Sequence, residues 1–260
     1  MSFGGIDHAR PDPPPEGRGC LWFVHNQCAR AACVLGAGSK MIDIYTCITA
    51  GYDDLKKQPV LGPHVRYRAF VEGVQRPLPP WVVSPVESVP EADPTRRARE
   101  MKVLAHRAVP DAEWSLWVDG CFVIRPDFQI LRWLSDYMQD ADLVTFQHTA
   151  DDCTYQHATR IVQVGLDRAP TVVAQMQRYR EGGLPEHAGM VQTNVMLRKH
   201  TPAVQAFNER WWQEIQAGSR RDQLSFVWAA RETGLKYRAL PVHERQYFHG
   251  KSHRGVRTNP

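Results

Sequence analysis

Apolar segments of two lengths alternate along this chain. Short runs rich in β-branched and aromatic residues predict strands, which we expect at 41–50, 65–73, 81–86, 114–120, 142–147 and 191–199. Between these runs, apolar residues recur at helical spacing and predict helices from Asp93 onward and at 126–139, 156–181, 203–215 and 220–230. The pattern therefore predicts an α/β protein.

Capping and helix-breaking residues support these boundaries. Asp93 is suited to cap a helix whose first turn contains Pro94. Pro170 is expected to divide the long segment 156–181 into two helices, and Gly182 to close the second one.

The alternation of strands and helices favours a mostly parallel sheet with helices on both faces, forming a single domain at 41–250. We expect a loose N-terminal arm and leading segment at 1–40 and a basic tail at 251–260. Ligands of such sheets bind beyond the carboxyl ends of the strands. The segment TAGYDD at 49–54 and Asp119 both fall at such ends.

Composition is that of an ordinary globular protein. Hydrophobic residues make up 43% and charged residues 23% of the 260 residues, and the formal net charge is +4. The first residues lack a cationic segment followed by an apolar core, and polar residues interrupt the most apolar early stretch, 20–38. We therefore expect a cytoplasmic protein without a membrane span. None of the six cysteines forms a CxxC pair, which disfavours zinc.

Asp119 is the most unusual residue of the expected core. It closes the apolar run WSLWV at 114–118 and is followed at once by Gly120. A buried carboxylate is costly unless a partner compensates its charge. Two explanations remain open: Asp119 caps the next turn or pairs with Arg125, or it binds a cation that carries a substrate.

Several motifs, taken in order, resemble one glycosyltransferase-like family. They are the segment ending in WSLWVDGCFVI (93–124), CTYQHA (153–158), GLPEHAGMVQTNVMLRKH (183–200) and NERWWQEIQAGSRRDQLSF (208–226). The family occurs in plants and bacteria, was long catalogued as a domain of unknown function, and includes Golgi proteins linked to pectin or mucilage synthesis. It is distantly similar to the glycogenin-type transferases. WVDG followed by RDQLSF is the most specific part of the resemblance, which covers about 41–250.

The resemblance implies a GT-A fold, a nucleoside diphosphate sugar as donor (a UDP-sugar above all), and Mn²⁺ or Mg²⁺ as cofactor. Asp119 is then the leading metal ligand, and His249 and His253 complete the shell, since hard cations prefer carboxylate oxygen and Mn²⁺ also accepts imidazole. The usual Asp-x-Asp metal motif is incomplete, however, because it reads Asp119-Gly120-Cys121 in this chain.

A second departure concerns the acceptor. The family pattern H..R.C.YEE appears as HTADDCTYQHA: His148 is kept, but Asp151 replaces the arginine and His157 replaces the acidic residue. Gln192 also stands where relatives often have glutamate. We expect His148 and Gln192 to contact the acceptor, although a histidine after a strand is more often structural.

The RDQLSF motif has two interpretations. Asp222 falls in the first turn of an expected helix, where a carboxylate caps free N–H groups. The resemblance instead places Asp222 on the donor sugar and Gln223 beside the anomeric carbon, with Asp119 as the third catalytic residue. If Asp222 faces the acceptor, it is the general base of an inverting enzyme. We expect a retaining enzyme by analogy only.

Further residues are expected to bind the donor. They share polar or cationic character, and they are Thr49, Tyr52, Asp53, Arg99, Lys102, Asn194, Arg221 and Lys251. Tyr52 is suited to stack on the base, and the cationic side chains to reach the diphosphate. A plain turn explains GYDD, and a solvated basic tail explains Lys251, equally well.

Three functions fit these residues. The first is a glycosyltransferase acting on a hydroxyl of a glycan, lipid carrier or small molecule. The second keeps the donor but takes hydroxymethylated bases of phage-type DNA as acceptor, because basic residues at 96–107 and in the tail would serve phosphates. The third is a catalytically inactive module that binds sugar or nucleic acid, since the metal motif is incomplete.

Overall fold

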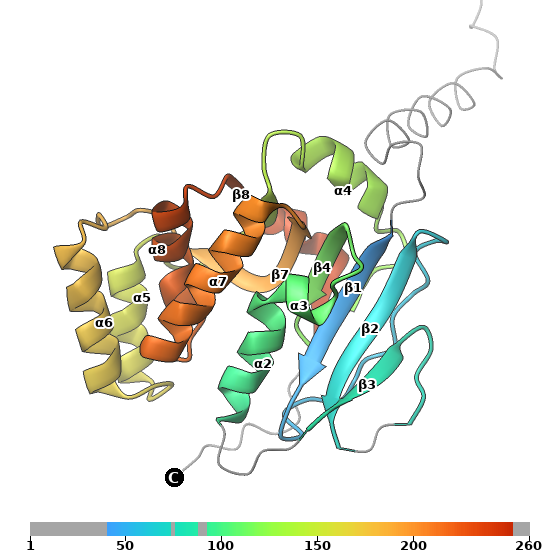
Figure 1. Ribbon diagram of the computed structural model, residues 1–260, viewed down its shortest axis with the longest axis horizontal. Helices are drawn as coiled ribbons and strands as arrows, with labels where there is room; N and C mark the ends of the chain where they lie inside the picture. Colours follow the sequence, from blue (N-terminus) through green and yellow to red (C-terminus); the bar gives the residue numbers. More distant parts are fainter. Residues whose placement is uncertain (1–40, 74–75, 88–92, 252–260) are drawn as a thin grey trace, which may run out of the picture.

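The computed structural model describes residues 41–73, 76–87 and 93–251. They form one α/β domain, drawn in Figure 1. The strands are β1 (Ile42–Ile48), β2 (Val65–Glu72), β3 (Val82–Val86), β4 (Trp114–Val118), β5 (Phe122–Ile124), β6 (Leu143–Gln147), β7 (Val191–Lys199), β8 (Tyr237–Leu240) and β9 (Phe248–Gly250). The helices are α2 (Pro94–Val103), α3 (Ala105–Ala108), α4 (Ile130–Tyr137), α5 (Thr154–Gln163), α6 (Ala169–Glu181), α7 (Pro202–Ala217), α8 (Gln223–Thr233) and the 3₁₀ helix η1 (Val242–Tyr247).

Seven strands form the main sheet in the order β3-β2-β1-β4-β7-β6-β8. Neighbouring strands are parallel except at β7, which runs antiparallel to both β4 and β6. The expected mostly parallel sheet flanked by helices is confirmed. Because only β7 is reversed, the carboxyl ends of β1, β4 and β6 lie at one edge of the sheet, and β7 begins at that same edge.

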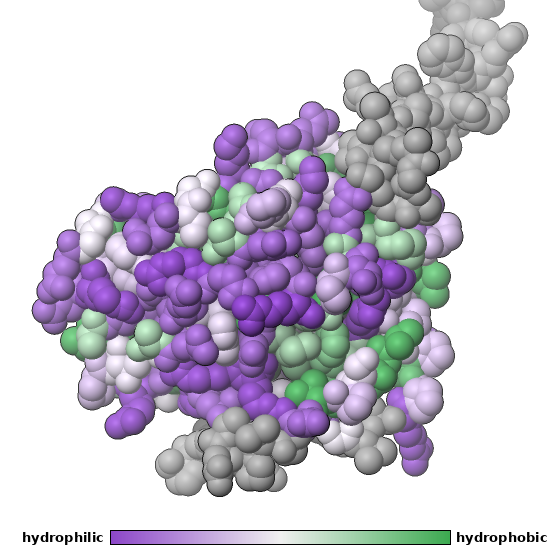
Figure 2. All heavy atoms as spheres, viewed as in Figure 1, coloured by the Kyte–Doolittle hydropathy of each residue, from purple (hydrophilic) through white to green (hydrophobic). Residues whose placement is uncertain are grey.

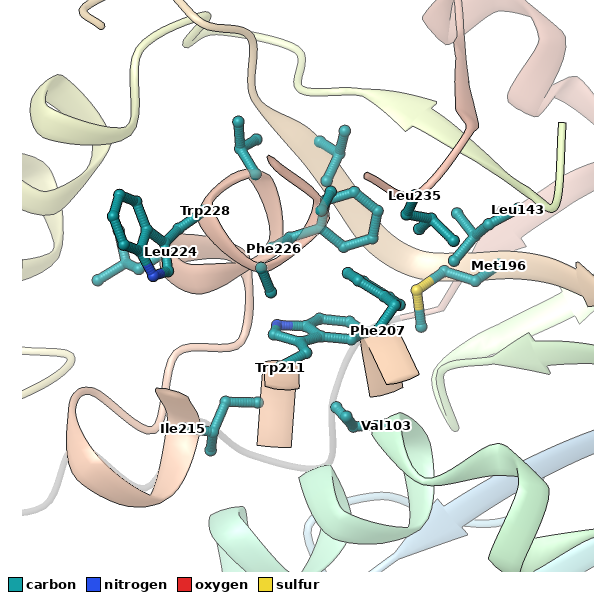
Figure 3. Packing of buried hydrophobic residues seen from close by; sticks show 14 of the residues in the cluster. Val103, Leu143, Met196, Phe207, Trp211, Ile215, Leu224, Phe226, Trp228 and Leu235 are labelled. Carbon is teal, nitrogen blue, oxygen red and sulfur yellow. The ribbon is translucent and has the colours of Figure 1, made fainter. Parts of the chain in front are cut away.

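Both faces of this sheet are buried, which explains the nearly continuous apolar runs of its strands. In β1, Ile44 packs into the cluster on one face and Tyr45 into the cluster on the other. The helices α2, α5, α6, α7 and α8 supply the larger cluster, in which Phe207, Trp211 and Phe226 meet at ring-centroid distances of 5.2–5.3 Å (Figure 3). Trp211 is therefore a core residue, as its helical spacing predicts.

The helix starts agree with the sequence, and one helix is shorter than expected. Asp93 accepts a hydrogen bond from the backbone N–H of Thr95, and Pro94 opens α2. The expected division near Pro170 is confirmed, because α6 begins at Ala169. The helix expected to run on from Asp93 breaks at Leu104, after which α3 adds one more turn.

Three short strands were not predicted. β8 extends the main sheet beside β6, whereas β5 and β9 form a separate two-stranded ribbon. β9 lies just before the segment expected to be a basic tail, and pairing with β5 brings this end of the chain against the turn that follows Asp119. Short strands of this kind give little sequence pattern, because three residues cannot establish an alternation. The expected arm at 1–40 and residues 252–260 lie outside the described residues.

Figure 2 shows one face of the molecule, which is mostly hydrophilic, with apolar surface gathered toward the end where Figure 1 places β2 and β3. Val82 of β3 belongs to this region and is 68% exposed. Within the described ranges, no helix is long and apolar enough to cross a membrane.

Gln58 joins the loop after β1 to the β5 ribbon. Its Nε2 donates to the carbonyl of Phe122 at 2.9 Å, and its Oε1 accepts from the N–H of Ile124 at 2.9 Å. The side chain is buried, so both backbone groups depend on it. We predict that Gln58→Leu lowers the free energy of unfolding by about 1–3 kcal/mol, since two buried backbone groups lose their partner. Urea denaturation measures the loss.

The exposed Gln139, which donates only to the carbonyl of Ser135, provides the matched control. Gln139→Leu is expected to change stability by less than about 0.5 kcal/mol. Equal losses in the two variants would contradict a bridging role for Gln58.

Candidate functional site

Asp119 follows β4 directly and lies at the carboxyl edge of the sheet. Its backbone N–H continues the β4–β7 ladder by donating to the carbonyl of Asn194 at 2.9 Å. A turn then begins, in which the N–H of Phe122 donates to the carbonyl of Asp119. Glycine is needed after Asp119, because a Cβ on Gly120 would lie 2.9 Å from the side chain of Ile48. The sheet thus fixes where the Asp119 carboxylate stands.

Protein groups compensate one oxygen of this carboxylate. The indole N–H of Trp117 donates to Oδ1 of Asp119 at 2.7 Å, and Nζ of Lys102 lies 3.3 Å from the same oxygen. Pairing with Arg125, one of the open alternatives, does not occur, because Arg125 binds Asp127 instead. Among the described residues, no hydrogen bond reaches Oδ2, and the side chain of Asp119 is 28% exposed.

Lys102 connects Asp119 to the RDQ motif. Its side chain is 1% exposed, and its Nζ lies 2.7 Å from Oδ2 of Asp222 and 3.1 Å from the hydroxyl of Thr193. Burial lowers the pKa of Lys102, and the carboxylates of Asp119 and Asp222 oppose that shift. One ammonium group from α2 therefore bridges the end of β4 and the start of α8.

Asp222 does not cap α8, although it occupies the N-cap position. Its side chain makes no capping hydrogen bond. The carboxylate instead forms ion pairs with Arg99, whose Nε lies 3.1 Å from Oδ1, and with Lys102, and it accepts from the hydroxyl of Thr193 at 2.7 Å. Burial raises the pKa of Asp222, but the charges of Arg99 and Lys102 outweigh it and hold the pKa well below its usual range.

Arg99 and Arg221 bring two more cationic groups to this cluster. Burial alone would lower the pKa of Arg99, yet the carboxylates of Asp222 and Asp119 raise it above its ordinary value. Arg221 differs, because burial and then the charge of Arg99 lower its pKa. Its Nε is buried without a hydrogen-bond partner among the described residues.

Amide groups line the neighbouring part of β7. Oε1 of Gln192 accepts from Arg245 at 2.7 Å and from Nδ2 of Asn194 at 3.2 Å. Oδ1 of Asn194 is buried and has no partner in the described part of the chain, so it is an available acceptor. Gln223, at the start of α8, donates to the carbonyl of Val191 at 3.3 Å. The sequence marks Arg245 only as one of several basic residues near the end of the chain, and its contact with Gln192 is set by the tertiary structure.

The turn after β1 contains the three residues expected around the nucleoside. Tyr52 is 64% exposed, as a stacking platform requires, whereas Asp53 is buried close to Gly120. Thr49 is less available than expected, because its hydroxyl donates to the carbonyl of Pro94 at 2.8 Å and so holds the start of α2.

The end of the described chain returns to the Asp119 turn. The backbone N–H of Lys251 donates to the carbonyl of Cys121 at 2.8 Å, so this exposed lysine stands beside the candidate site. His249 pairs with Val123 in the ribbon. His253, the other expected metal ligand, lies outside the described residues.

His148 belongs to a separate network. Its Nδ1 accepts from the backbone N–H groups of Ala150 and Asp151. Asp151 is buried and binds His157 at 2.7 Å and Arg160 at 2.7 Å. The acidic and basic positions that differ from the family pattern therefore pair with each other, which favours a structural role for this part of the expected acceptor site.

The ligand set expected for a divalent cation does not assemble around Asp119 within the described residues. Among all described residues, one group of three carboxylate, imidazole or thiol ligands has its ligand atoms within 4.8 Å of one another. It consists of His148, Asp151 and His157 and does not include Asp119. Asp119 has one carboxylate oxygen already held by Lys102 and Trp117. These residues fit an internally neutralised carboxylate better than a metal centre.

The mixed sheet and the polar groups at its carboxyl edge define a GT-A-like α/β fold. Residues 66–247 match the family model of the TOD1/MUCI70 glycosyltransferase-like domain, and the chain belongs to this family. The probable hexosyltransferase MUCI70 of Arabidopsis thaliana is 28% identical over 162 residues, which are 56% of this chain and 26% of that protein. The chain thus spans about a quarter of the length of this curated relative.

The low pKa of Asp222 gives a pH-dependent prediction. A carboxylate whose pKa is lower in the folded state stabilises the fold above its unfolded pKa, and the contribution is lost as pH falls. We predict that Asp222→Asn costs about 3–5 kcal/mol at pH 7, because Arg99 and Lys102 lose their partner. This cost should shrink below the ordinary carboxyl pKa of 3.8. Urea denaturation across this pH range measures it.

Asp136 pairs with Arg132 on the surface and provides the control. Asp136→Asn is expected to have an effect below about 1 kcal/mol at every pH. A cost of Asp222→Asn that stays constant down to the lowest pH at which the chain is folded would show that ionic pairing is not its origin.

Proposed function

We propose that this chain transfers a sugar from a nucleoside diphosphate sugar to an acceptor hydroxyl on a glycan, a lipid carrier or a small molecule. The observation that carries the proposal is the buried, ionised Asp222 next to Gln223, joined through Lys102 to Asp119 at the carboxyl edge of the sheet. Membership of a glycosyltransferase-like family and the hexosyltransferase relative support the reaction class. A UDP-sugar is the proposed donor.

In this proposal the donor lies across the cluster. Tyr52 stacks on the base, and Asp53 accepts from the ribose. Arg221 and Lys251 face the diphosphate, while Asp222 and Asn194 accept hydrogen bonds from sugar hydroxyls. Asn194 is suited to this because its buried Oδ1 has no partner among the described residues.

Gln223 lies next to the reacting carbon. The bond between the anomeric carbon and the β-phosphate oxygen breaks, and its electron pair leaves with the diphosphate. The acceptor oxygen forms the new bond, and its proton passes to the departing phosphate. The amide of Gln223 stabilises the positive charge that develops on the sugar through its carbonyl dipole.

Asp222 is poorly suited to act as the general base of an inverting enzyme. A base works best when its pKa lies near the operating pH. Arg99 and Lys102 hold the pKa of Asp222 well below the usual carboxyl range. A retaining transfer is therefore the stereochemistry we propose.

The other functions receive less support. Nothing in the comparisons points to nucleic acid, so a DNA acceptor has no observation in its favour. An inactive module would have no use for an ionised carboxylate and an amide placed together in a buried cluster. The cytoplasmic location stays a prediction.

The donor is tested with a panel of nucleoside diphosphate sugars, followed by thermal shift and by release of free sugar. We predict that Gln223→Ala lowers donor hydrolysis about 100-fold, since it removes one group that stabilises the transition state. Affinity for the nucleoside diphosphate alone should stay within about threefold, because Gln223 contacts only the sugar.

Gln216→Ala, on the exposed side of α7, is the control and should behave as wild type. A panel in which no nucleoside diphosphate sugar binds or is hydrolysed would leave the inactive module as the better description.

A further inference from the structure

We propose that this chain binds the diphosphate of its donor without a divalent cation, with Lys102 in the place of the cation at Asp119 and Arg221 as the residue that contacts the phosphates. This inference rests on the proposed function and concerns how the same site neutralises the leaving group. It departs from the metal expected from the family resemblance.

The first step is the state of Asp119. In a metal-dependent site this carboxylate would be compensated by the cation. Here Lys102 and the indole N–H of Trp117 already compensate it through Oδ1. Since Lys102 is 1% exposed and packs against Thr193 as well, it has no room to withdraw without breaking several contacts. A cation at Oδ2 would stand close to this fixed ammonium group and be repelled by it.

The second step is the charge of the cluster. Its carboxylates are Asp119 and Asp222, and its cations are Arg99, Lys102 and Arg221. With Lys102 protonated, these five groups together carry one more positive than negative charge. A diphosphate brings two negative charges to this cationic group, whereas a divalent cation would add to its positive charge.

The third step is the unpaired guanidinium. Arg99 and Lys102 have carboxylate partners, but Arg221 forms no ion pair among the described residues, and its Nε is buried without a partner. Leaving a buried polar group unsatisfied is unfavourable, so this Nε is available to a ligand. The charges of Asp222 and Asp119 act on Arg221, so its guanidinium belongs to the same electrostatic cluster.

Arginine is also the right group for this ligand. Its planar guanidinium donates two parallel hydrogen bonds to phosphate oxygens and keeps its charge in a buried site. When the bond between the anomeric carbon and the β-phosphate oxygen breaks, the electron pair remains on the diphosphate. Arg221 would stabilise that negative charge by donating hydrogen bonds to the phosphate oxygens, so no metal ion has to enter or leave with the product.

The test is binding of uridine diphosphate to the full chain, measured by calorimetry in EDTA and in Mn²⁺, with adenosine and guanosine diphosphates in parallel. We expect the Kd for the preferred nucleotide to agree within about threefold between the two buffers. Arg221→Gln should weaken binding in EDTA by about tenfold or more, and Arg221→Lys by less, since the charge is kept.

Arg220→Gln is the matched control, because this neighbouring arginine pairs with Asp93 instead. It should bind the nucleotide within about twofold of wild type. The melting temperature of each unliganded variant shows whether it is folded, and Arg221→Lys keeps the test valid if Arg221→Gln does not fold.

Three results would contradict the inference or the proposed function on which it rests. Binding that is at least about tenfold tighter in Mn²⁺ than in EDTA would contradict metal-free binding and leave the proposed function intact. Absence of binding by all three nucleotides in both buffers would contradict the proposed function itself. Equal binding by Arg221→Gln and Arg220→Gln would remove Arg221 from the phosphate site.

Discussion

The ammonium group of Lys102 is the interaction on which the rest of the site depends. It is buried between Asp119 and Asp222 and pairs with both carboxylates at once, since its Nζ lies 3.3 Å from Oδ1 of Asp119 and 2.7 Å from Oδ2 of Asp222. The backbone that carries it is fixed as well. Tyr45 and Arg198 both donate to the carbonyl of Lys102, at the point where α2 ends. A buried arginine thus serves to hold a buried lysine.

This constraint explains why three distant segments form one surface. Lys102 comes from α2, Asp119 from the end of β4, and Asp222 from the start of α8. Strand pairing sets Asp119 beside β7, and Thr193 of β7 bonds both Lys102 and Asp222. The core of α7 and α8 then sets the position of Asp222, since the indole N–H of Trp211 donates to its backbone carbonyl. Packing of α8 against α7, where Trp211 meets Phe226 in Figure 3, therefore positions the RDQ motif.

The same cluster accounts for the incomplete metal motif. A glycosyltransferase must neutralise the leaving diphosphate, and either a cation or protein side chains supply that charge. In this chain the second carboxylate of the usual motif is absent and Cys121 stands in its place, while cationic side chains surround Asp119. The loss of an acidic ligand and the presence of an unpaired arginine point in the same direction. In our proposal, the lone carboxylate at the strand end orients Lys102 instead of binding a metal ion.

The sequence by itself determined the α/β class, the positions of most helices and strands, and which polar and charged residues were candidates for a functional site. Apolar periodicity, the Asp93 cap and the RDQ motif are local signals, and local signals depend only on nearby residues. The sequence could not determine which side chains contact one another. Whether Asp222 caps its helix or pairs with Lys102, and whether Asp119 meets Arg125 or Lys102, was decided by strand order and by which side chains the two buried faces bring together. The short β9 strand likewise exists only because β5 is there to pair with it, and this contact, set by tertiary structure, brings Lys251 to the site.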